Sequence, residues 1–381
     1  MKRYDAIVVG ARCAGASTAL LLARRGYRVL LVDRAAFPSE IPHGHYIHRH
    51  GPRRLWKWGL LERIAATCPP VTSITLDLGD FPLVGRDLAV DGIAAGYGPR
   101  RSTLDALLVE AACAAGAELR QGFPVTGVLR EGDTITGIRG RQAGGAETSE
   151  RAAIVIGADG RNSFVARAAG ASCYESEAPV AFYYFSYWSG MPDRGLEVLV
   201  RRPSMIFSFP TNDGLTGVFV GWPMAHLDRV RREIDASVMA VAGCAPDFAE
   251  RLRGARREER YLGATDLPNF VRRPCGPGWA LVGDAGCHKD PMMALGICDA
   301  LRDAELLSDA VDAALSGRQP WPDALGGYER SRNAATLADY RENLVAARLE
   351  PPPPSVVQLR RRLRDDPVAT RQFFLAREGI A

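Results

Sequence analysis

The chain of 381 residues is long enough for two domains, and its composition is that of an ordinary globular protein. Its formal net charge of +4 is small and evenly spread, which argues against a nucleic-acid partner. The eight cysteines lack Cys-x-x-Cys spacing, so we expect reduced thiols without disulfides or zinc. No apolar run is long enough to span a bilayer, and Asp5 and Arg12 interrupt the N-terminal apolar stretch. We therefore reject an export signal and expect a cytoplasmic protein.

The first 34 residues predict a strand, a tight turn, a helix and a second strand. After Asp5, residues 6–9 are apolar and mostly β-branched, 16–25 are rich in Ala and Leu, and 27–32 form another mostly apolar run. This is a βαβ unit of the dinucleotide-binding kind, whose turn and helix N-terminus accept a pyrophosphate. Asp33 ends the second strand, where a carboxylate can accept ribose hydroxyls, and 17 residues separate it from Gly15.

The glycine motif departs from the Gly-x-Gly-x-x-Gly pattern, because Arg12 stands at its middle glycine. Phosphates approach this position closely, so the Arg12 side chain either turns outward or reaches a phosphate or another part of the cofactor. An ordinary strand–helix turn is the alternative to a nucleotide site. We expect the following residues to bind the cofactor: Gly10, Arg12, Cys13, Ala14, Gly15, Asp33 and Arg34.

A loop rich in histidine follows, with His43, His45, His48 and His50 within eight residues. A metal site would need further Cys or carboxylate ligands at suitable spacing, and none stands nearby, so we expect no metal. The loop is either a polar segment with satisfied histidines or the lining of a cofactor site. In the second case His45 and His48 are candidate catalytic residues.

The rest of the chain alternates between helical and strand patterns. A helix is expected from Arg101, and its start carries two arginines, Arg100 and Arg101, suited to phosphate or ribose. Later in the chain a buried strand runs into the Asp159-Gly160 turn. Aromatic residues crowd 182–188. Further strands are expected at 196–200, 205–209, 215–222 and 279–282, and further helices at 227–252, 302–315 and 324–346. A stiff Pro351–Pro354 break then precedes a basic helical tail of unknown role.

Three acid–glycine anchors lie far apart in this order: Gly10 with Asp33, Asp159-Gly160, and Gly283-Asp284. Over roughly residues 4–345 they resemble the para-hydroxybenzoate-hydroxylase-like superfamily, the group A FAD-dependent monooxygenases and their relatives. The resemblance implies an α/β fold with a Rossmann-like (GR2-type) FAD-binding domain, an inserted antiparallel β-sheet substrate domain and C-terminal helices. The expected boundaries are 1–170 and 262–345 for the FAD-binding domain, with a smaller β insertion around 65–100, 171–261 for the substrate domain, and 346–381 for the tail.

The resemblance also implies roles for single residues. Asp159 and Gly160 would contact both FAD and the nicotinamide donor, and Asp284 would bind the flavin ribityl and pyrophosphate. Pro291 lies beside the isoalloxazine in the implied site. The remaining cofactor contacts that it implies are Arg101, Gly283, Gly296 and Ile297.

Residues near the third anchor depart from the family pattern. Cys287 and Cys298 are read as small fillers near the flavin, with a catalytic thiol as the alternative. Lys289 either binds an acidic substrate or lowers the pKa of a phenol. In both cases we expect it to matter for turnover more than for folding. The alternative is that it is a surface partner of Asp290. The Trp56-Lys57-Trp58 segment lies too early in the chain to be the Trp-x-Trp-x-Ile-Pro motif of flavin halogenases.

The resemblance implies an FAD-dependent monooxygenase of bacterial secondary metabolism that uses NAD(P)H and O₂. It would hydroxylate a small aromatic or polycyclic substrate through a flavin hydroperoxide. The alternatives are a reductase or saturase resembling geranylgeranyl reductases, a halogenase-like enzyme, or a non-catalytic flavin-binding protein. An aromatic stripe is equally common in an ordinary core. We expect the substrate cavity to be lined by Phe182, Tyr184, Trp188, Phe207 and Phe209. The sequence does not specify the oligomeric state.

Overall fold

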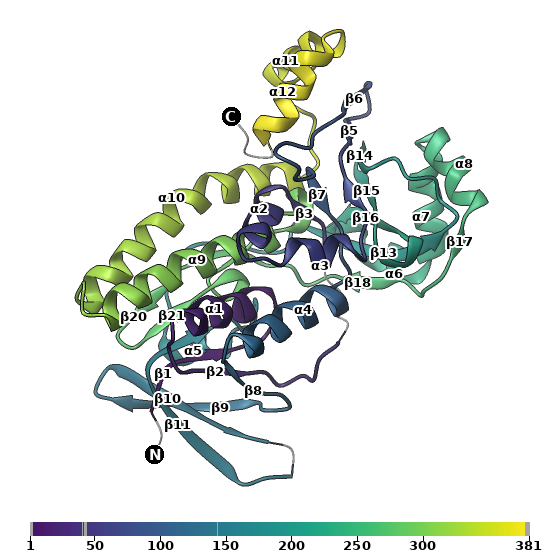
Figure 1. Ribbon diagram of the computed structural model, residues 1–381. Helices are drawn as coiled ribbons and strands as arrows, with labels where there is room; N and C mark the ends of the chain where they lie inside the picture. Colours follow the sequence, from purple (N-terminus) through teal and green to yellow (C-terminus); the bar gives the residue numbers. More distant parts are fainter. Residues whose placement is uncertain (1–2, 40, 42–43, 143, 378–381) are drawn as a thin grey trace.

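The computed structural model describes residues 3–39, 41, 44–142 and 144–377, and it contains two large sheets (Figure 1). The first sheet carries the expected βαβ unit: β1 (Arg3–Val9) pairs in parallel with β2 (Val29–Val32) and with β11 (Glu147–Gly157). Such strands are buried on both faces, which explains their continuous apolar runs. The sheet continues through β8 (Glu118–Arg120), β9 (Val125–Glu131), β10 (Thr134–Arg141), β20 (Cys275–Gly276) and β21 (Trp279–Leu281).

Helices cover one face of the first sheet. The apolar side chains of this face pack on α1 (Cys13–Arg24), α4 (Arg101–Ala114), α9 (Gly296–Leu315) and α10 (Trp321–Ala347). The opposite face packs on β9, β10 and α5 (Phe164–Ala169). This layered arrangement puts the carboxyl ends of β1, β2 and β11 at one edge, where ligands bind in α/β folds.

The second sheet is antiparallel except where β14 and β5 run parallel. Its strands, in spatial order, are β17 (Arg256–Arg257), β13 (Ala181–Ser189), β16 (Thr216–Pro223), β15 (Ser204–Pro210), β14 (Leu196–Arg201), β5 (Ile74–Asp77) and β6 (Pro82–Gly85), with β18 (Leu262–Ala264) beside β13. Two strands from the expected 65–100 insertion, β5 and β6, therefore extend the second sheet. The predicted fold class is confirmed.

Short elements connect and cover the two sheets. The outer face of the second sheet packs on α6 (Leu227–Arg232), α7 (Ile234–Gly243) and α8 (Pro246–Gly254). Two small sheets consist of β3 (Ile47–His48), β7 (Gly96–Tyr97) and β4 (Pro70–Val71), and of β12 (Cys173–Glu177), β19 (Asn269–Arg272) and β22 (Cys287–His288). The remaining elements are α2 (His50–Lys57), α3 (Leu61–Ala65) and the 3₁₀ turns η1 (Asn212–Gly214), η2 (Met224–His226), η3 (Gly283–Ala285) and η4 (Pro291–Met293).

The C-terminal helices α11 (Pro354–Arg364) and α12 (Pro367–Arg377) pack on the β5–β6 hairpin, at the top of Figure 1. Arg360 pairs with Asp80 at 2.6 Å, and a Cβ on Gly85 would lie 2.3 Å from the Phe374 ring. Within the described residues, the two helices of the predicted tail thus pack against the second sheet.

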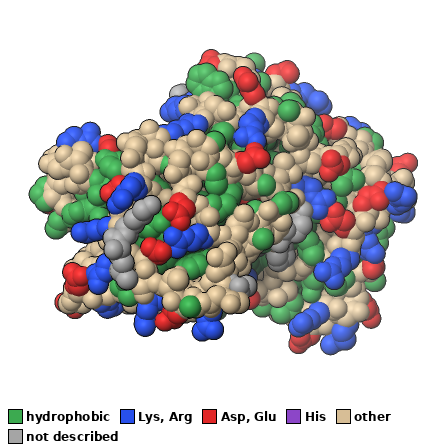
Figure 2. Space-filling view, turned by 60° about the horizontal axis from the view of Figure 1, so that its bottom comes forward, with side chains coloured by type: hydrophobic (Ala, Val, Ile, Leu, Met, Phe, Trp, Pro, Cys, Tyr) green, Lys and Arg blue, Asp and Glu red, His purple; other side chains and the backbone are tan. Residues whose placement is uncertain are grey.

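The surface carries charges of both signs side by side, as Figure 2 shows for one face. This agrees with the even spread expected from the sequence. Among the described helices, none is both long and apolar enough to cross a membrane.

Candidate active site

The first anchor is a turn that only glycine fits at two positions. Gly10 has φ +100°, and a Cβ there would lie 2.4 Å from the Ala158 carbonyl oxygen. A Cβ on Gly15 would lie 1.7 Å from the Gly10 carbonyl oxygen. The helical ladder of α1 begins with the bond from Ala16 N–H to Arg12 C=O, so the N–H groups of Cys13, Ala14 and Gly15 precede this ladder. The turn is a cradle that an anionic group can approach.

Asp33 fixes the backbone of this turn. Its carboxylate accepts hydrogen bonds from the backbone N–H groups of Ala11 and Ala35, both at 2.7 Å. The side chain therefore fixes the turn itself, and its contact with a ribose stays a prediction. The neighbouring Arg34 is exposed.

The Arg12 side chain is held by partners within the protein. Its guanidinium donates to the Asp105 carboxylate at 2.8 Å and to Ser39 at 3.0 Å. Asp105 is fully buried and also accepts from Arg101 at 3.0 Å and from the Cys13 thiol at 3.2 Å. One carboxylate thus holds two guanidinium groups, which leaves a positive charge beside the cradle. The contact of Arg12 with a phosphate or another part of the cofactor stays a prediction.

The second anchor is also used inside the fold. Asp159 accepts hydrogen bonds from Ser163 Oγ at 2.5 Å and from Phe164 N–H at 2.6 Å, so it holds the first turn of α5, whose N-cap residue is Ser163. Burial raises the pKa of its carboxyl. Gly160 has φ +77°, a conformation that favours glycine. Ala158 and Asp159 border the Gly10 turn, so the first two anchors meet.

The third anchor completes this group. Gly283 has φ +57°, and a Cβ there would lie 2.9 Å from the Ala14 Cβ. Asp284 is half-buried, its charge acts on Arg101, and no hydrogen bond to its carboxylate is found among the described residues. A carboxylate next to a glycine cradle and close enough to act on an arginine fits the ribityl and pyrophosphate of FAD. Gly296 and Ile297 begin α9 beside it.

The loop around Pro291 is held mainly through Asp290, which is 2% exposed. The Asp290 carboxylate accepts from the Tyr183 hydroxyl at 2.6 Å and from Met292 N–H at 3.0 Å. Its backbone N–H donates to Asn269 at 2.7 Å, and its carbonyl accepts from Asn343 at 2.9 Å. Burial raises the Asp290 pKa to about 6. Residues from β13, β19 and α10 thus fix this loop.

Lys289 lies inside the protein, with its side chain 4% exposed. Its ammonium pairs with Asp299 at 2.6 Å, and Asp299 also pairs with Arg302 at 2.6 Å. Burial alone would lower the pKa of Lys289, but the Asp299 carboxylate outweighs it and raises that pKa. The alternative of a surface partner for Asp290 is wrong, because the lysine is buried against α9. Its role toward a substrate stays a prediction.

The two candidate catalytic histidines, His45 and His48, contact different parts of the structure. His45 is buried, with Nδ1 3.0 Å from the Gly98 carbonyl and Nε2 3.0 Å from the Tyr187 hydroxyl. Burial lowers the His45 pKa to about 3. The ring is therefore neutral at physiological pH, so Nδ1–H donates to Gly98 and Nε2 accepts from Tyr187. His48 Nε2 lies 3.0 Å from the Met293 carbonyl, beside Pro291. His43 lies outside the described residues.

The choice of sheet face requires a correction. Phe182, Tyr184 and Trp188 pack in the cluster with α7 and α8, on the outer face. The alternate residues of the same strand point the other way, as the period of two demands. Phe207 and Phe209 do lie on this inner side. The inner wall, as we call it, consists of Tyr183, Phe185, Tyr187, Phe207, Phe209 and Phe219.

Sequence reasoning missed two carboxyls that organise the site. Asp105 follows Arg101 by four residues on a helix, a spacing that favours an ion pair. Asp290 precedes Pro291 at the start of a turn, where Asp is a common cap. Tyr183 and Asn343 carried no comparable local signal, because their partners are distant in the chain.

The family described as "FAD binding domain" matches residues 3–241. A digeranylgeranylglycerophospholipid reductase of Methanosarcina mazei is 26% identical over 328 residues, which cover 82% of this chain and 76% of the relative. A 1H-pyrrole-2-carbonyl-[peptidyl-carrier protein] brominase of Pseudoalteromonas luteoviolacea is 22% identical, with 89% and 86% covered. The structure of PqsL from Pseudomonas aeruginosa with 2-aminobenzoylacetate has the same fold, with a TM-score of 0.80, 22% identity, and 91% and 96% covered.

Proposed function

This chain belongs to the FAD binding domain family and is an FAD-dependent oxidoreductase, and from that premise we propose that it is a monooxygenase. It uses NAD(P)H and O₂ to hydroxylate a small aromatic or polycyclic substrate. The observation that carries this proposal is the inner wall, a set of aromatic side chains on the sheet face opposite α7 and α8. Such a wall excludes water and stacks on aromatic rings.

The cofactor would be held by the three anchors. The cradle at Gly10 and Gly15 and the positive charge of the Arg12–Arg101–Asp105 group suit the pyrophosphate, and Asp284 suits the ribityl hydroxyls. When bound, FAD supplies the electron transfer and the oxygen chemistry, and the protein supplies position and a dry environment.

Residues of the chain then have separate tasks in the proposed reaction. His45, as a neutral ring, orients the Tyr187 hydroxyl at the inner wall. His48 and Asp290 hold the loop around Pro291, to which the proposed flavin ring is adjacent. Because Tyr183, Asn269 and Asn343 hold Asp290 from three separate elements, the loop is preorganised before ligands bind.

Two relatives bear on the choice of reaction. PqsL binds 2-aminobenzoylacetate, an aromatic compound, in the same fold, which supports an aromatic substrate here. The reductase alternative is supported by the 26% identity with the Methanosarcina mazei enzyme. For a halogenase, the Trp56–Trp58 segment gives no support, because Trp56 is 59% exposed and Trp58 packs in the core of the first sheet.

The reaction type is tested by isotope labelling. The FAD-loaded protein is incubated with NADH or NADPH and a panel of aromatic compounds under ¹⁸O₂. We expect a hydroxylated product that carries one ¹⁸O atom. A saturated product formed without oxygen would establish the reductase alternative and contradict the monooxygenase.

A further inference from the structure

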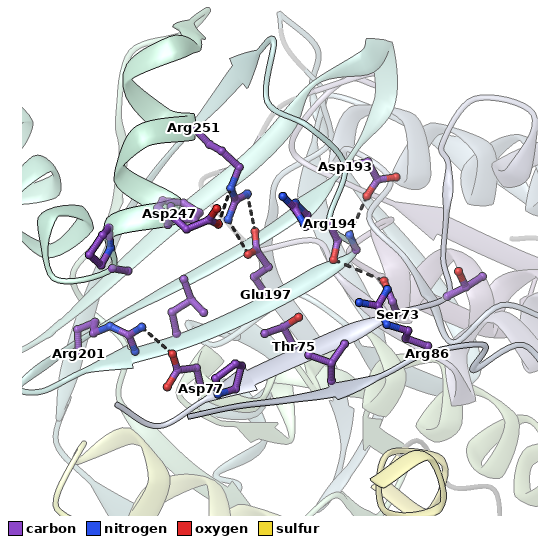
Figure 3. Close-up of a pocket in the computed structure, with 18 of the residues that line it drawn as sticks. Ser73, Thr75, Asp77, Arg86, Asp193, Arg194, Glu197, Arg201, Asp247 and Arg251 are labelled. Atoms are coloured by element: carbon purple, nitrogen blue, oxygen red, sulfur yellow. Dashed lines mark hydrogen bonds and ion pairs between the residues drawn. The ribbon is translucent and has the colours of Figure 1, made fainter. Parts of the chain in front are cut away.

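A polar cleft of about 570 Å³ lies on the outer side of the second sheet, between the β5–β6 hairpin, β14 and the start of α8 (Figure 3). Its volume falls within the range of small-molecule sites. Along β5 and β14, Thr75 and Glu197 face the cleft, whereas Ile74 and Val198 pack with the inner wall. One layer of sheet therefore separates the cleft from the candidate active site.

Two ion pairs build the floor of the cleft. Arg201 pairs with Asp77 at 2.6 Å, and Arg251 pairs with Glu197 at 2.7 Å. These four side chains are at most 16% exposed. Arg251 also holds Asp247 at 3.0 Å. These arginines are neutralised by built-in partners and belong to the frame of the cleft.

Arg86 and Arg194 differ from the floor arginines. Both line the cleft, and no ion pair of either side chain is found in the described ranges. The nearby Asp193 accepts a hydrogen bond from Gly195 N–H at 2.7 Å, within its own loop. Figure 3 shows Arg86 and Arg194 at the end of the cleft where Ser73 lies. Two guanidinium forks are thus available to a ligand at this end, whereas the Ser73 hydroxyl donates to the Arg194 carbonyl at 3.5 Å.

We propose that this cleft binds a small organic anion, with its carboxylate or phosphate head between Arg86 and Arg194. Guanidinium forks match the paired oxygens of such heads. The lining holds four carboxylates and four guanidinium groups, so selectivity rests on the two unpaired arginines and not on net charge. Beyond the head, the cleft offers a short apolar surface formed by Val84, Leu199 and Phe248.

The test uses calorimetric titration of the full-length, FAD-loaded protein at low ionic strength, because salt screens exposed charges. The probes are butyl phosphate and pentanoate, with inorganic phosphate as the head alone. We expect saturable one-site binding of at least one organic probe, tighter than that of inorganic phosphate. The organic probe that binds with the higher affinity identifies the head group as phosphate or carboxylate.

Variants locate the bound probe. The double variant Arg86→Gln/Arg194→Gln should weaken binding at least about tenfold, whereas Arg253→Gln, an exposed arginine of α8 outside the cleft, should leave it unchanged. The absorbance of bound flavin reports that each variant is folded. If the double variant does not fold, the two single variants are measured in its place. Absence of saturable binding at millimolar concentrations, or equal binding by the double variant, would overturn the proposal. Equal affinity for inorganic phosphate would overturn its organic part.

Discussion

Asp290 shows how one buried carboxyl makes stability depend on pH. Burial raises its pKa from 3.8 to about 6, so the folded protein holds this proton more tightly than the unfolded chain. The contribution of Asp290 to stability is therefore full below pH 4 and is lost as the pH rises through 6. An asparagine keeps an oxygen acceptor for Tyr183 and Met292 without the charge.

We predict that the difference in unfolding free energy between Asp290→Asn and wild type shifts in favour of the variant by about 2 kcal/mol when the pH is raised from 4.5 to 7.5. Urea unfolding with saturating FAD at both pH values measures the difference. Asp266→Asn, at an exposed carboxylate, is the control and should show no such gain. A difference between Asp290→Asn and wild type that does not change with pH would contradict the shifted pKa.

Lys289 belongs to a buried ion pair with Asp299, so we predict that it contributes to folding, and its expected role in turnover stays a prediction. Lys289→Met leaves the Asp299 charge with Arg302 alone and should cost about 3–5 kcal/mol of unfolding free energy. The double variant Lys289→Met/Asp299→Asn should recover much of this loss. Denaturant titration measures both effects. A Lys289→Met protein of wild-type stability and slower turnover would instead support a direct role toward the substrate.

Asp284 offers a direct test of the cofactor site. Because its carboxylate has no hydrogen-bond partner among the described residues, Asp284→Ala should leave the fold intact and lower FAD affinity at least about tenfold, the loss of one charge-assisted contact. Fluorescence titration of the apoprotein with FAD measures this, with Asp266→Ala as the control. Wild-type affinity in Asp284→Ala would remove the ribityl role from this residue.

At the scale of elements, the C-terminal helices complete the second sheet. Phe374 is 3% exposed and packs with β6 in the cluster that contains the inner wall, whereas the adjacent Phe373 is only partly buried. We predict that Phe374→Ala lowers the unfolding free energy by about 3–5 kcal/mol and Phe373→Ala by much less. Thermal unfolding with bound FAD compares them. Equal effects would mean that the helices do not dock as described.

Local patterns predicted elements well where neighbours in the chain decide them. The β1–α1–β2 unit and the Asp159-Gly160 turn follow from apolar runs and glycine positions. Alternation predicted that β13 has two aromatic faces, yet it could not say which one is covered. That choice is made by α7 and α8, which follow β13 by more than forty residues. The pairing of β5 with β14 joins segments even further apart.

For the whole molecule, the sequence predicted that three distant anchors belong to one site, and the contacts Gly10–Ala158 and Gly283–Ala14 bring them together. Their separation in the chain hides this from local patterns, and only the resemblance suggested it. The networks of Asp105 and Asp290 were missed, because each links side chains from elements that meet only in the folded protein.

In the proposed monooxygenase, we expect NAD(P)H use to be coupled to hydroxylation. An enzyme of this kind wastes reducing equivalents as H₂O₂ when no substrate fills its pocket, so oxidation of NAD(P)H should be slow alone and faster with the right aromatic compound. Phe207 belongs to the inner wall and Tyr184 to the outer face of the same sheet. Removing an inner ring admits water to the pocket, whereas removing an outer ring does not. Phe207→Leu should therefore raise the share of NAD(P)H lost as H₂O₂ several-fold, and Tyr184→Leu should not. A peroxide assay alongside NAD(P)H absorbance measures this share in both variants. An equal rise in the two would mean that the inner wall does not line the reaction chamber.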